Sequence, residues 1–279
     1  MTDYNAIDRL TAQLSRAQSG ASERQADVAG RLHRARRVVV LSGAGISVAS
    51  GIGTYRGAGG LWENPELLEA HQVESLPDSL PIIWSVKGPM RARALAARPN
   101  PAHMALVKLE RQLVGRGGSL TIITQNIDGL HQRAGNTEVL EMHGSMMRSR
   151  CYDRMCALKP FEDTYAPPAG EVPICPRCQV QPLRPDVVLF GEALPWSVIS
   201  AAESALHQAE VLLVVGTSGA VSSATTTIDS AAAYGVYCVL INKEPWDHPH
   251  PHVNETLLGP AEEVLPRLVF LADAQAGPA

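Results

Sequence analysis

The chain has 279 residues, with 24 Lys and Arg against 28 Asp and Glu, for a formal net charge of -4. Hydrophobic residues make up 45% of the chain and charged residues 19%, a balance that is typical of a folded globular protein and excludes wholesale disorder. This length allows one large domain or a main domain with a smaller insert, and the weakly acidic charge supplies no positive field for a phosphate backbone. We therefore expect no nucleic-acid partner.

The beginning of the chain predicts a protein of the cytoplasm. Residues 1–29 are expected to form a helical segment, and the first ten carry Asp3 and Asp8 without the basic and apolar run of a secretory signal. The apolar stretch over 231–241 is shorter than the ~20 residues that a membrane-spanning helix needs. We expect no membrane association, and we expect a monomer.

Short apolar runs recur between helical stretches and predict the strands of a buried parallel sheet. They are residues 38–41, 120–124, 138–141, 187–190, 211–215 and 236–241. This alternation is typical of an α/β fold with a Rossmann-like, doubly wound parallel sheet, in which ligands bind beyond the carboxyl ends of the strands. We expect this domain to comprise residues 30–142 and 185–268, with a flexible tail over 269–279.

Two segments interrupt the pattern. Residues 143–184 contain two cysteine pairs and several prolines with little periodicity, which predicts a small zinc-binding insert domain. Part of 51–100 is rich in glycine and proline at its start, and we expect a binding loop and a helical module there. The basic residues of this second segment predict a solvated helix face, with docking of an acidic peptide as the alternative. They are Lys87, Arg91, Arg93 and Arg98.

The cysteines predict a metal site. Cys151 and Cys156 are separated by four residues and Cys175 and Cys178 by two, and two thiolate pairs of this kind suit tetrahedral zinc in a reducing compartment. Four thiolates leave no position for a water, which favours a structural zinc over a catalytic one. A nucleic-acid zinc ribbon is disfavoured because interleaved aromatic residues and a basic surface are missing. We expect Cys238, within an apolar run, to be a buried thiol.

A glycine-rich turn over residues 42–47 follows the first predicted strand. Gly43 and Gly45 allow the backbone to turn tightly and approach a pyrophosphate, while the next helix offers its N-terminal N–H groups to the anion. Val48 replaces the third glycine of the dinucleotide fingerprint, and no acidic residue ends a second strand about 20 residues later. These departures disfavour a redox Rossmann domain.

The continuation of this turn resembles the cofactor-loop signature of the sirtuins. Matching motifs run in order along residues 30–268: Gly43-Ala44-Gly45-Ile46-Ser47, Ser50-Gly51-Ile52, Tyr55-Arg56, Gly60-Leu61-Trp62, Thr124-Gln125-Asn126-Ile127-Asp128-Gly129-Leu130-His131, His143-Gly144-Ser145, the two cysteine pairs, Arg184 to Glu192, Gly216-Thr217-Ser218 and Ile241-Asn242. An ordered set is far more specific than any single motif. The chain resembles a bacterial-type catalytic core, nearer to the branch with a Gly-Ala-Gly-Gly-Leu-Trp loop.

The resemblance implies an NAD-dependent deacylase that acts on acyl-lysine in proteins or peptides. In this chemistry the acyl amide oxygen attacks the ribose carbon that bears nicotinamide, and the acyl group ends on ADP-ribose. His143 would be the general base, because imidazole ordinarily titrates near the working pH; a histidine satisfied in the core is the alternative. Asn126 would hold the ribose or a water and Asp128 would accept from the nicotinamide amide, with turn and cap chemistry as their alternatives.

The resemblance also implies two larger sets of contacts. The residues that would bind NAD are Gly43, Ala44, Gly45, Ser47, Thr54, Tyr55, Arg56, Trp62, Gln125, Asn126, Asp128, Gly216, Thr217, Ser218, Asn242, Glu244 and Ala261. The residues that would bind the substrate are Val188, Leu189, Phe190, Gly191, Glu192, Gly219, Val221 and Met90. Segments 187–192 and 219–221 would hold an extended peptide by strand addition, which tolerates many sequences.

Two departures from the family pattern bear on activity. Gly53 and Tyr55 stand where the family has proline and phenylalanine, and glycine widens the conformational choice of the loop. Access of water would favour NAD hydrolysis, so an NAD hydrolase or ADP-ribosyltransferase on the same fold is the alternative activity. A non-catalytic NAD sensor is disfavoured because His143, Asn126 and Asp128 are all kept.

The second departure concerns the acyl group. The branch that includes desuccinylases grips an acyl carboxylate with a tyrosine and an arginine three residues apart, and the matching positions here are Lys87 and Met90. Lysine cannot replace the planar fork of arginine. We therefore expect neutral acyl groups to bind beside Met90 and succinyl- and malonyl-lysine to be poor substrates, with Arg91 or Arg93 as alternative carboxylate partners.

Overall fold

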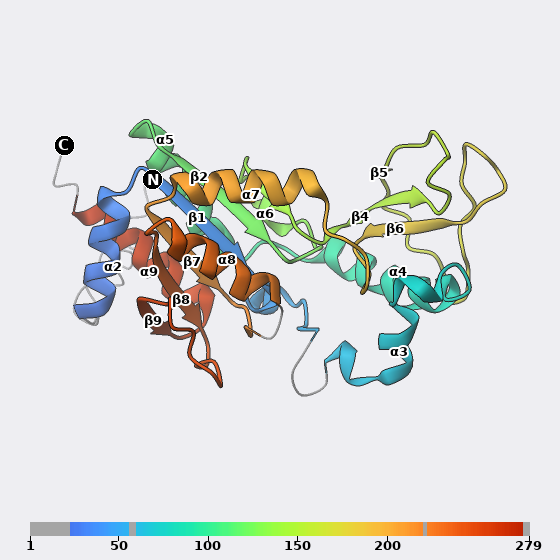
Figure 1. The fold of residues 1–279 in the computed structure, drawn as a ribbon, viewed down its shortest axis with the longest axis horizontal. Coiled ribbons are helices and arrows are strands. Elements are labelled where there is room, and N and C mark those ends of the chain that lie inside the picture. The colour runs from blue at the N-terminus through green and yellow to red at the C-terminus, as the bar shows by residue number, and fades with distance from the viewer. Residues whose placement is uncertain (1–22, 56–59, 220–221, 276–279) are drawn as a thin grey trace, which may run out of the picture.

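A computed structural model describes residues 23–55, 60–219 and 222–275 of the chain, and a parallel sheet forms its larger part (Figure 1). Six strands lie in the order β3-β2-β1-β7-β8-β9, and every neighbouring pair is parallel. Their bounds are β1 Arg37–Ser42, β2 Ser119–Thr124, β3 Val139–Glu141, β7 Val211–Val215, β8 Tyr237–Asn242 and β9 Glu255–Leu258. The predicted doubly wound α/β fold is confirmed, and the order reverses between β1 and β7, the point where such sheets bind ligands.

Helices cover both faces of the sheet. Helices α2 (Glu23–Arg34), α5 (Pro101–Gly115) and α9 (Ala261–Ala274) pack on one face, and α7 (Trp196–Gln208) and α8 (Ser222–Ala233) pack on the other. In β1, Val38 and Val40 belong to the first core, while Val39 and Leu41 belong to the second. Because successive side chains enter different cores, the strand is apolar at all four of these positions, which explains the continuous runs in the sequence.

A second lobe surrounds the cysteine pairs, on the right of Figure 1. It contains α3 (Pro65–Ala70), α4 (Leu80–Ala96) and an antiparallel sheet in the order β5-β4-β6. The bounds of these strands are β4 Gly144–Cys151, β5 Phe161–Glu162 and β6 Leu183–Val187. Helix α4 shares one hydrophobic core with the two longer strands, and the indole of Trp84 donates a 2.9 Å hydrogen bond to the carbonyl of Leu183. The helical module and the insert therefore form one packed unit.

The apolar run over residues 187–190 is not a strand of the parallel sheet, contrary to the sequence prediction. Only Val187 belongs to a strand, and it pairs antiparallel with Gly144 of β4. Phe190 makes an isolated bridge to Gln72. A short apolar run has the same appearance in a parallel and an antiparallel sheet, so the sequence cannot assign the partner.

The prediction of a solvated basic helix face is wrong for two of its four residues. Arg93 and Arg98 are exposed, but Arg91 is fully buried and Lys87 is only 3% exposed. The guanidinium of Arg91 forms an ion pair of 2.9 Å with Asp163 and donates to the carbonyl oxygens of Met146 and Tyr165. Burial of this charge is tolerated because residues of the insert pair with the guanidinium. These partners are distant in sequence, so the local pattern did not indicate them.

The C-terminal end of the described chain is more ordered than the sequence predicts. Helix α9 continues to Ala274, and Val269 and Ala272 are buried, where a flexible tail from residue 269 was expected. Helix α2 begins at Glu23, and its Val28 and Ala29 already belong to the core of the main domain. A search of the described helices finds none that is both long and apolar enough to cross a membrane.

Candidate functional site

The glycine-rich turn after β1 packs directly on the turn after β7. A side-chain carbon added at Gly45 would lie 2.7 Å from the Cα of Gly216, and one added at Gly43 would lie 2.7 Å from the oxygen of the same residue. The amide of Gly45 donates a 2.8 Å hydrogen bond to that oxygen. The two glycines are needed because two backbones meet at the switch point of the sheet. The helix expected after the turn is a 3-10 helix, Ala44–Ser50.

A polar network fills the space beyond β1 and β2. The amide of the Asn126 side chain donates to the carbonyl of Gly43 at 3.1 Å and to the hydroxyl of Ser47 at 3.3 Å. The Ser47 hydroxyl donates to Asp128 at 2.7 Å, and the other carboxylate oxygen of Asp128 accepts from the Leu130 amide at 2.9 Å. Burial raises the pKa of Asp128, and these hydrogen bonds oppose the rise. The predicted residues Ser47, Asn126 and Asp128 are thus brought together.

His143 is held in one defined tautomer by Gln125, the residue before Asn126. Its Nδ1 is 2.9 Å from the carbonyl oxygen of Gln125, and a carbonyl can only accept, so Nδ1 carries the hydrogen. The Nε2 atom is then left with a lone pair that can take a proton. Burial lowers the pKa of His143, while the hydrogen bond to Gln125 opposes that change. The carbonyl of His143 also accepts from the amide of Val188 at 2.9 Å, which ties the predicted base to the predicted substrate segment.

The remaining predicted contacts of the main domain follow β7 and β8. Thr217 is buried and accepts from the indole of Trp246 at 2.6 Å, and the ring of Trp246 lies where a side chain at Gly219 would be. Ser218 is exposed. Asn242 ends β8 and donates to the carbonyl of Glu244, whereas Ala261 is buried at the start of α9. Arg56 and Val221 fall outside the described residues.

An aromatic cluster brings together three residues that the sequence predicted to bind NAD or substrate. A histidine and a lysine join them. Tyr55 stacks on Trp62 with 5.7 Å between ring centroids, and the edge of Trp62 meets Phe190 at 5.2 Å and His71 at 4.9 Å. The ammonium of Lys87 lies over the rings of Tyr55 and Trp62. No motif marked His71, because an isolated histidine in a helical stretch carries no signal of its contacts. Thr54, just before the cluster, is exposed, and Met90 is partly buried against the core of the small lobe.

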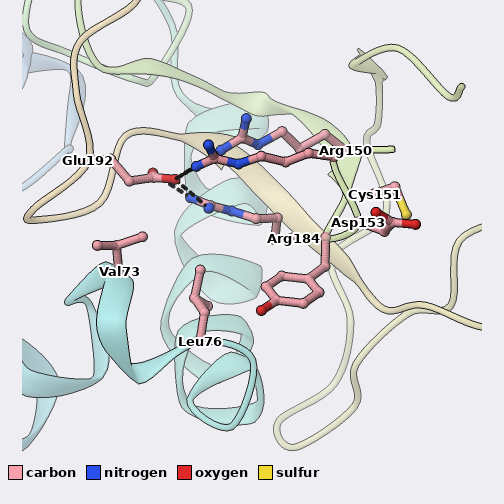
Figure 2. A pocket seen from close by; sticks show the side chains of 9 residues that line it. Val73, Leu76, Arg150, Cys151, Asp153, Arg184 and Glu192 are labelled. Atoms are coloured by element: carbon pink, nitrogen blue, oxygen red, sulfur yellow. Dashed lines mark hydrogen bonds and ion pairs between the residues drawn. The ribbon is translucent and has the colours of Figure 1, made fainter. Parts of the chain in front are cut away.

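The predicted substrate segment 188–192 is held at the junction of the two lobes. The amide of Phe190 donates to His71 and its carbonyl accepts from Val73, at 3.0 and 2.9 Å. Gly191 is exposed and Leu189 is buried. Both carboxylate oxygens of Glu192 accept 2.8 Å hydrogen bonds from Arg184 (Figure 2). Glu192 lines a cavity of about 320 Å³ beside the small lobe.

The four predicted ligand cysteines lie in a metal-binding arrangement. Their sulfur atoms are all within 4.8 Å of one another, with Cys151 and Cys178 at 3.9 Å and Cys156 and Cys175 at 3.9 Å. A tetrahedral zinc with Zn–S bonds of about 2.3 Å requires sulfur separations of about 3.8 Å. No two of these cysteines form a disulfide. The donor set therefore fits one structural zinc ion, and Cys238 is a separate, buried thiol as expected.

We expect the purified protein to contain one zinc per chain, and removal of that zinc to unfold the small lobe. The lobe has a limited core, and zinc would crosslink segments near Cys151 and Cys175 that are otherwise joined by loops. Elemental analysis and thermal melting before and after treatment with a strong chelator measure both effects. The variant Cys178→Ser should lose the metal, whereas Cys238→Ala should retain it. A chelator-treated protein with an unchanged melting temperature would contradict this role.

Two buried histidines lie beneath the glycine-rich turn. The rings of His103 and His131 are 4.9 Å apart, and His131 is hydrogen-bonded at 2.9 Å to the hydroxyl of Ser42, which donates to Thr124. Burial lowers the pKa of His103 to about 4, and burial together with the neighbouring His103 lowers that of His131 to about 3. Both rings are therefore neutral in the folded protein at pH 7.

We expect acid to destabilise the protein through this histidine pair. An unfolded histidine binds a proton near pH 6.5 and the folded rings do not, so stability is full above pH 6.5 and falls as the pH drops toward 4. At pH 5 the expected loss is about 2 kcal/mol for each ring. Urea denaturation at pH 7 and pH 5 measures it, and the variant His103→Gln should lose less on acidification than the parent chain. Equal losses in the two proteins would exclude His103 as a source.

Comparisons with known proteins agree with this geometry. A model described as "Sir2 family" matches residues 43–223. An NAD-dependent protein deacylase of Thermus thermophilus is 44% identical over 80% of this chain and 85% of its own. NAD-dependent protein deacylase 1 of Pseudomonas aeruginosa is 39% identical over 84% of this chain and 94% of its own.

Solved structures give the same result. A Sir2 homolog in complex with NAD is 33% identical, with a TM-score of 0.79 over 89% of this chain and 94% of that chain. A mutant Sir2 homologue in complex with ADP-ribose has a TM-score of 0.82 and 33% identity, and it covers 93% of this chain and 100% of that one. The family model spans more than half of the chain and the curated relatives match most of it, so the chain belongs to the Sir2 family, the sirtuins.

Proposed function

We propose that the chain is an NAD-dependent protein-lysine deacylase, with nicotinamide and O-acyl-ADP-ribose as its products. The observation that carries the proposal is the fixed tautomer of His143, whose Nδ1 is bound to the carbonyl of Gln125, the residue before Asn126 in the network of Ser47, Asn126 and Asp128. A neutral imidazole with a depressed pKa suits a base that must accept a ribose proton at neutral pH. Relatives named NAD-dependent protein deacylase support the same activity.

The residues around the glycine-rich turn would bind NAD. When bound, NAD supplies the ribose carbon that is attacked and the ADP-ribose that receives the acyl group. Gly43 and Gly45 expose the turn, Asn126 orients a hydroxyl or a water, and the buried carboxylate of Asp128 accepts hydrogen bonds from an amide. Gly216 and Thr217 border the same turn, and their backbone would face the pyrophosphate.

Acyl-lysine would enter from the junction of the lobes. A Sir2 protein of known structure, 26% identical to this chain, is bound to acetylated peptide. In this chain the extended segment 188–191 is anchored to His143 at one end and to residues 71–73 at the other, so a peptide added along it would pass the base. Strand addition relies on backbone hydrogen bonds, and we expect broad tolerance of the peptide sequence.

The experiment is an incubation of the protein with NAD and a panel of acyl-lysine peptides, analysed by mass spectrometry. A deacylase forms O-acyl-ADP-ribose only when an acyl peptide is present, and it consumes NAD in a one-to-one ratio with that peptide. NAD consumption without peptide would identify an NAD hydrolase, and ADP-ribose attached to a protein would identify a transferase. Either result would replace the proposal.

We further propose a cytoplasmic protein, because four unpaired thiols at zinc-binding distances suit a reducing compartment. A monomeric state and the lack of a nucleic-acid partner stay predictions from the sequence. Sedimentation and binding to duplex DNA at low salt would measure them.

A further inference from the structure

A histidine-rich tract lies in the loop between β8 and β9. Its sequence is Asp247-His248-Pro249-His250-Pro251-His252, so three of the 9 histidines of the chain fall within five consecutive residues. Short histidine-rich tracts are typical of metal-binding segments. These histidines belong neither to the predicted NAD contacts nor to the predicted peptide contacts, and they are outside every motif that the chain shares with the sirtuins.

The tract is held against α8 at both ends. The ring of Trp246, just before the tract, and the side chain of Val253, just after it, pack in the hydrophobic core that contains Ile228 of α8. Asp229 follows Ile228 on that helix. The two prolines of the tract fix φ at their positions, so the segment between the anchors loses little conformational freedom when it binds a ligand.

Two imidazoles of the tract approach one carboxylate oxygen. The Nε2 atoms of His250 and His252 lie 3.5 and 3.7 Å from Oδ1 of Asp229. Both separations exceed the usual length of an N–H···O hydrogen bond, about 2.7–3.2 Å. They are close to the distance of about 3.4 Å that joins two ligand atoms of a tetrahedral ion with bonds of about 2.1 Å. The three side chains therefore have the spacing of metal ligands around the carboxylate.

Contacts between the side chains themselves do not account for this arrangement. The rings of His250 and His252 are 5.7 Å apart between centroids and inclined by 52°, so they do not stack face to face. Among the residues that the structure describes, these two histidines are the only charged or hydrogen-bonding partners of Asp229. The side chains of Asp229 and His252 are 59% and 51% exposed, so an ion can reach them from solvent.

We propose that Asp229, His250 and His252 form a second metal site, which binds a divalent transition ion such as Zn²⁺ or Ni²⁺ and is separate from the four cysteines. Two neutral imidazoles and a carboxylate are donors that these ions accept. Three protein ligands leave the remaining position to water, so this ion exchanges with solvent, unlike an ion enclosed by four thiolates. The inference goes beyond the proposed deacylase activity and does not depend on it.

Binding requires two small changes. In the described part of the chain, only the four cysteines form a group whose ligand atoms all lie within 4.8 Å of one another, so the imidazoles must close around the ion. The half-exposed ring of His252 is free to rotate toward it. The Nδ1 atom of His250 accepts from the amide of His252 at 3.3 Å, so the neutral ring carries its hydrogen on Nε2. Coordination moves that hydrogen to Nδ1 and gives up this long contact.

These costs make the second site weaker than the cysteine site. We expect its ion to be lost on gel filtration, so the purified protein still contains one zinc per chain. When present, the ion would join α8 to the loop after β8. That loop also contacts the turn over residues 216–219, because the indole of Trp246 donates to the carbonyl of Thr217 at 2.6 Å. A crosslink between these segments stabilises the folded state by linkage.

The test uses protein without a polyhistidine tag, with zinc in the cysteine site and with excess metal removed. Calorimetric titration with Ni²⁺ and with Zn²⁺ should show one additional ion per chain, and the melting temperature should rise with the concentration of either ion. A chromogenic zinc indicator shows that the cysteine site keeps its zinc during the Ni²⁺ titration. The variants His250→Gln and Asp229→Asn should each weaken binding at least tenfold, because even the loss of a group that only supports a ligand costs about 10- to 100-fold.

The matched control is His248→Gln, which removes an exposed histidine of the same tract that makes no ion pair with Asp229 in the described structure. It should bind Ni²⁺ as the parent does. Equal weakening in His248→Gln and His250→Gln would indicate loose chelation by the tract and overturn the site. Unchanged binding in Asp229→Asn, or the lack of a second ion in the parent, would overturn it as well. Thermal melting without added metal confirms that each variant is folded.

Discussion

Replacement of His143 by alanine should lower kcat for acyl-lysine peptides by about 10²- to 10⁴-fold, which is the usual contribution of a general base. The physical reason is the fixed tautomer, because the carbonyl of Gln125 holds the hydrogen on Nδ1 and leaves Nε2 as the proton acceptor. Alanine removes that acceptor, and the neighbouring Asp128 cannot replace it because its carboxylate is already held by Ser47 and Leu130. Binding of NAD, measured by calorimetry, should change much less than kcat.

The pH profile of kcat/KM provides a second measurement of the same group. Burial lowers the pKa of His143, so the base is neutral and active at pH 7, and activity falls only when the pH drops below the ordinary value of about 6.5. The acid limb should disappear from the residual activity of His143→Ala. The exposed His248→Ala is the control and should show the parent profile. Turnover within a few-fold of the parent in His143→Ala would exclude His143 as the base.

Replacement of Arg91 by leucine should destabilise the small lobe by about 3–5 kcal/mol, the cost of removing one partner from a buried charged network. The guanidinium is fully buried and makes hydrogen bonds to the carbonyls of Met146 and Tyr165 and to the hydroxyl of Ser149, besides its ion pair with Asp163. Leucine fills part of the volume but leaves those oxygen atoms without donors. Helix α4 would lose its main polar attachment to the insert.

The measurement is denaturant unfolding together with the rate of zinc release to a chromogenic chelator. Arg91→Leu should unfold at lower denaturant and release metal faster, and Arg91→Lys should lie between the two because it keeps the charge but not the planar fork. Arg93→Leu, on the same helix but exposed, is the matched control and should behave as the parent. Equal unfolding midpoints for Arg91→Leu and Arg93→Leu would contradict the structural role of Arg91.

The sequence predicted those parts of the molecule that depend on neighbours along the chain. Strands β1, β2 and β7 are covered on both faces, and continuous apolar runs therefore predicted them within one or two residues. The edge strand β9 has two partly buried residues at its start and was not predicted. The cysteine pairs predicted the ligand set because metal ligands on tight turns have short and recognisable spacings. The motif that contains Asn126 and Asp128 is also contiguous in the sequence, so it could be recognised without knowledge of the fold.

The tertiary structure alone decided the environments of residues whose partners are far away in the sequence. Arg91 binds the carbonyl of Tyr165, 74 residues away, and the hydroxyl of Ser149, 58 residues away. A local window shows a basic helix at this place and predicts exposure, since it cannot contain the groups that compensate a buried charge. Glu192 likewise accepts two hydrogen bonds from Arg184 of β6, a pairing that no sequence motif indicated.

The sequence by itself determined the family and the cluster of four cysteines that fits zinc, because each depends on residue types in fixed order along the chain. It could not determine what surrounds Lys87. Helix α4 places that ammonium against Tyr55 and Trp62 from a separate loop, and no carboxylate among the described residues approaches it. Charge burial is a property of the packed molecule, so the environment of Lys87 is decided only when the loop and the helix come together.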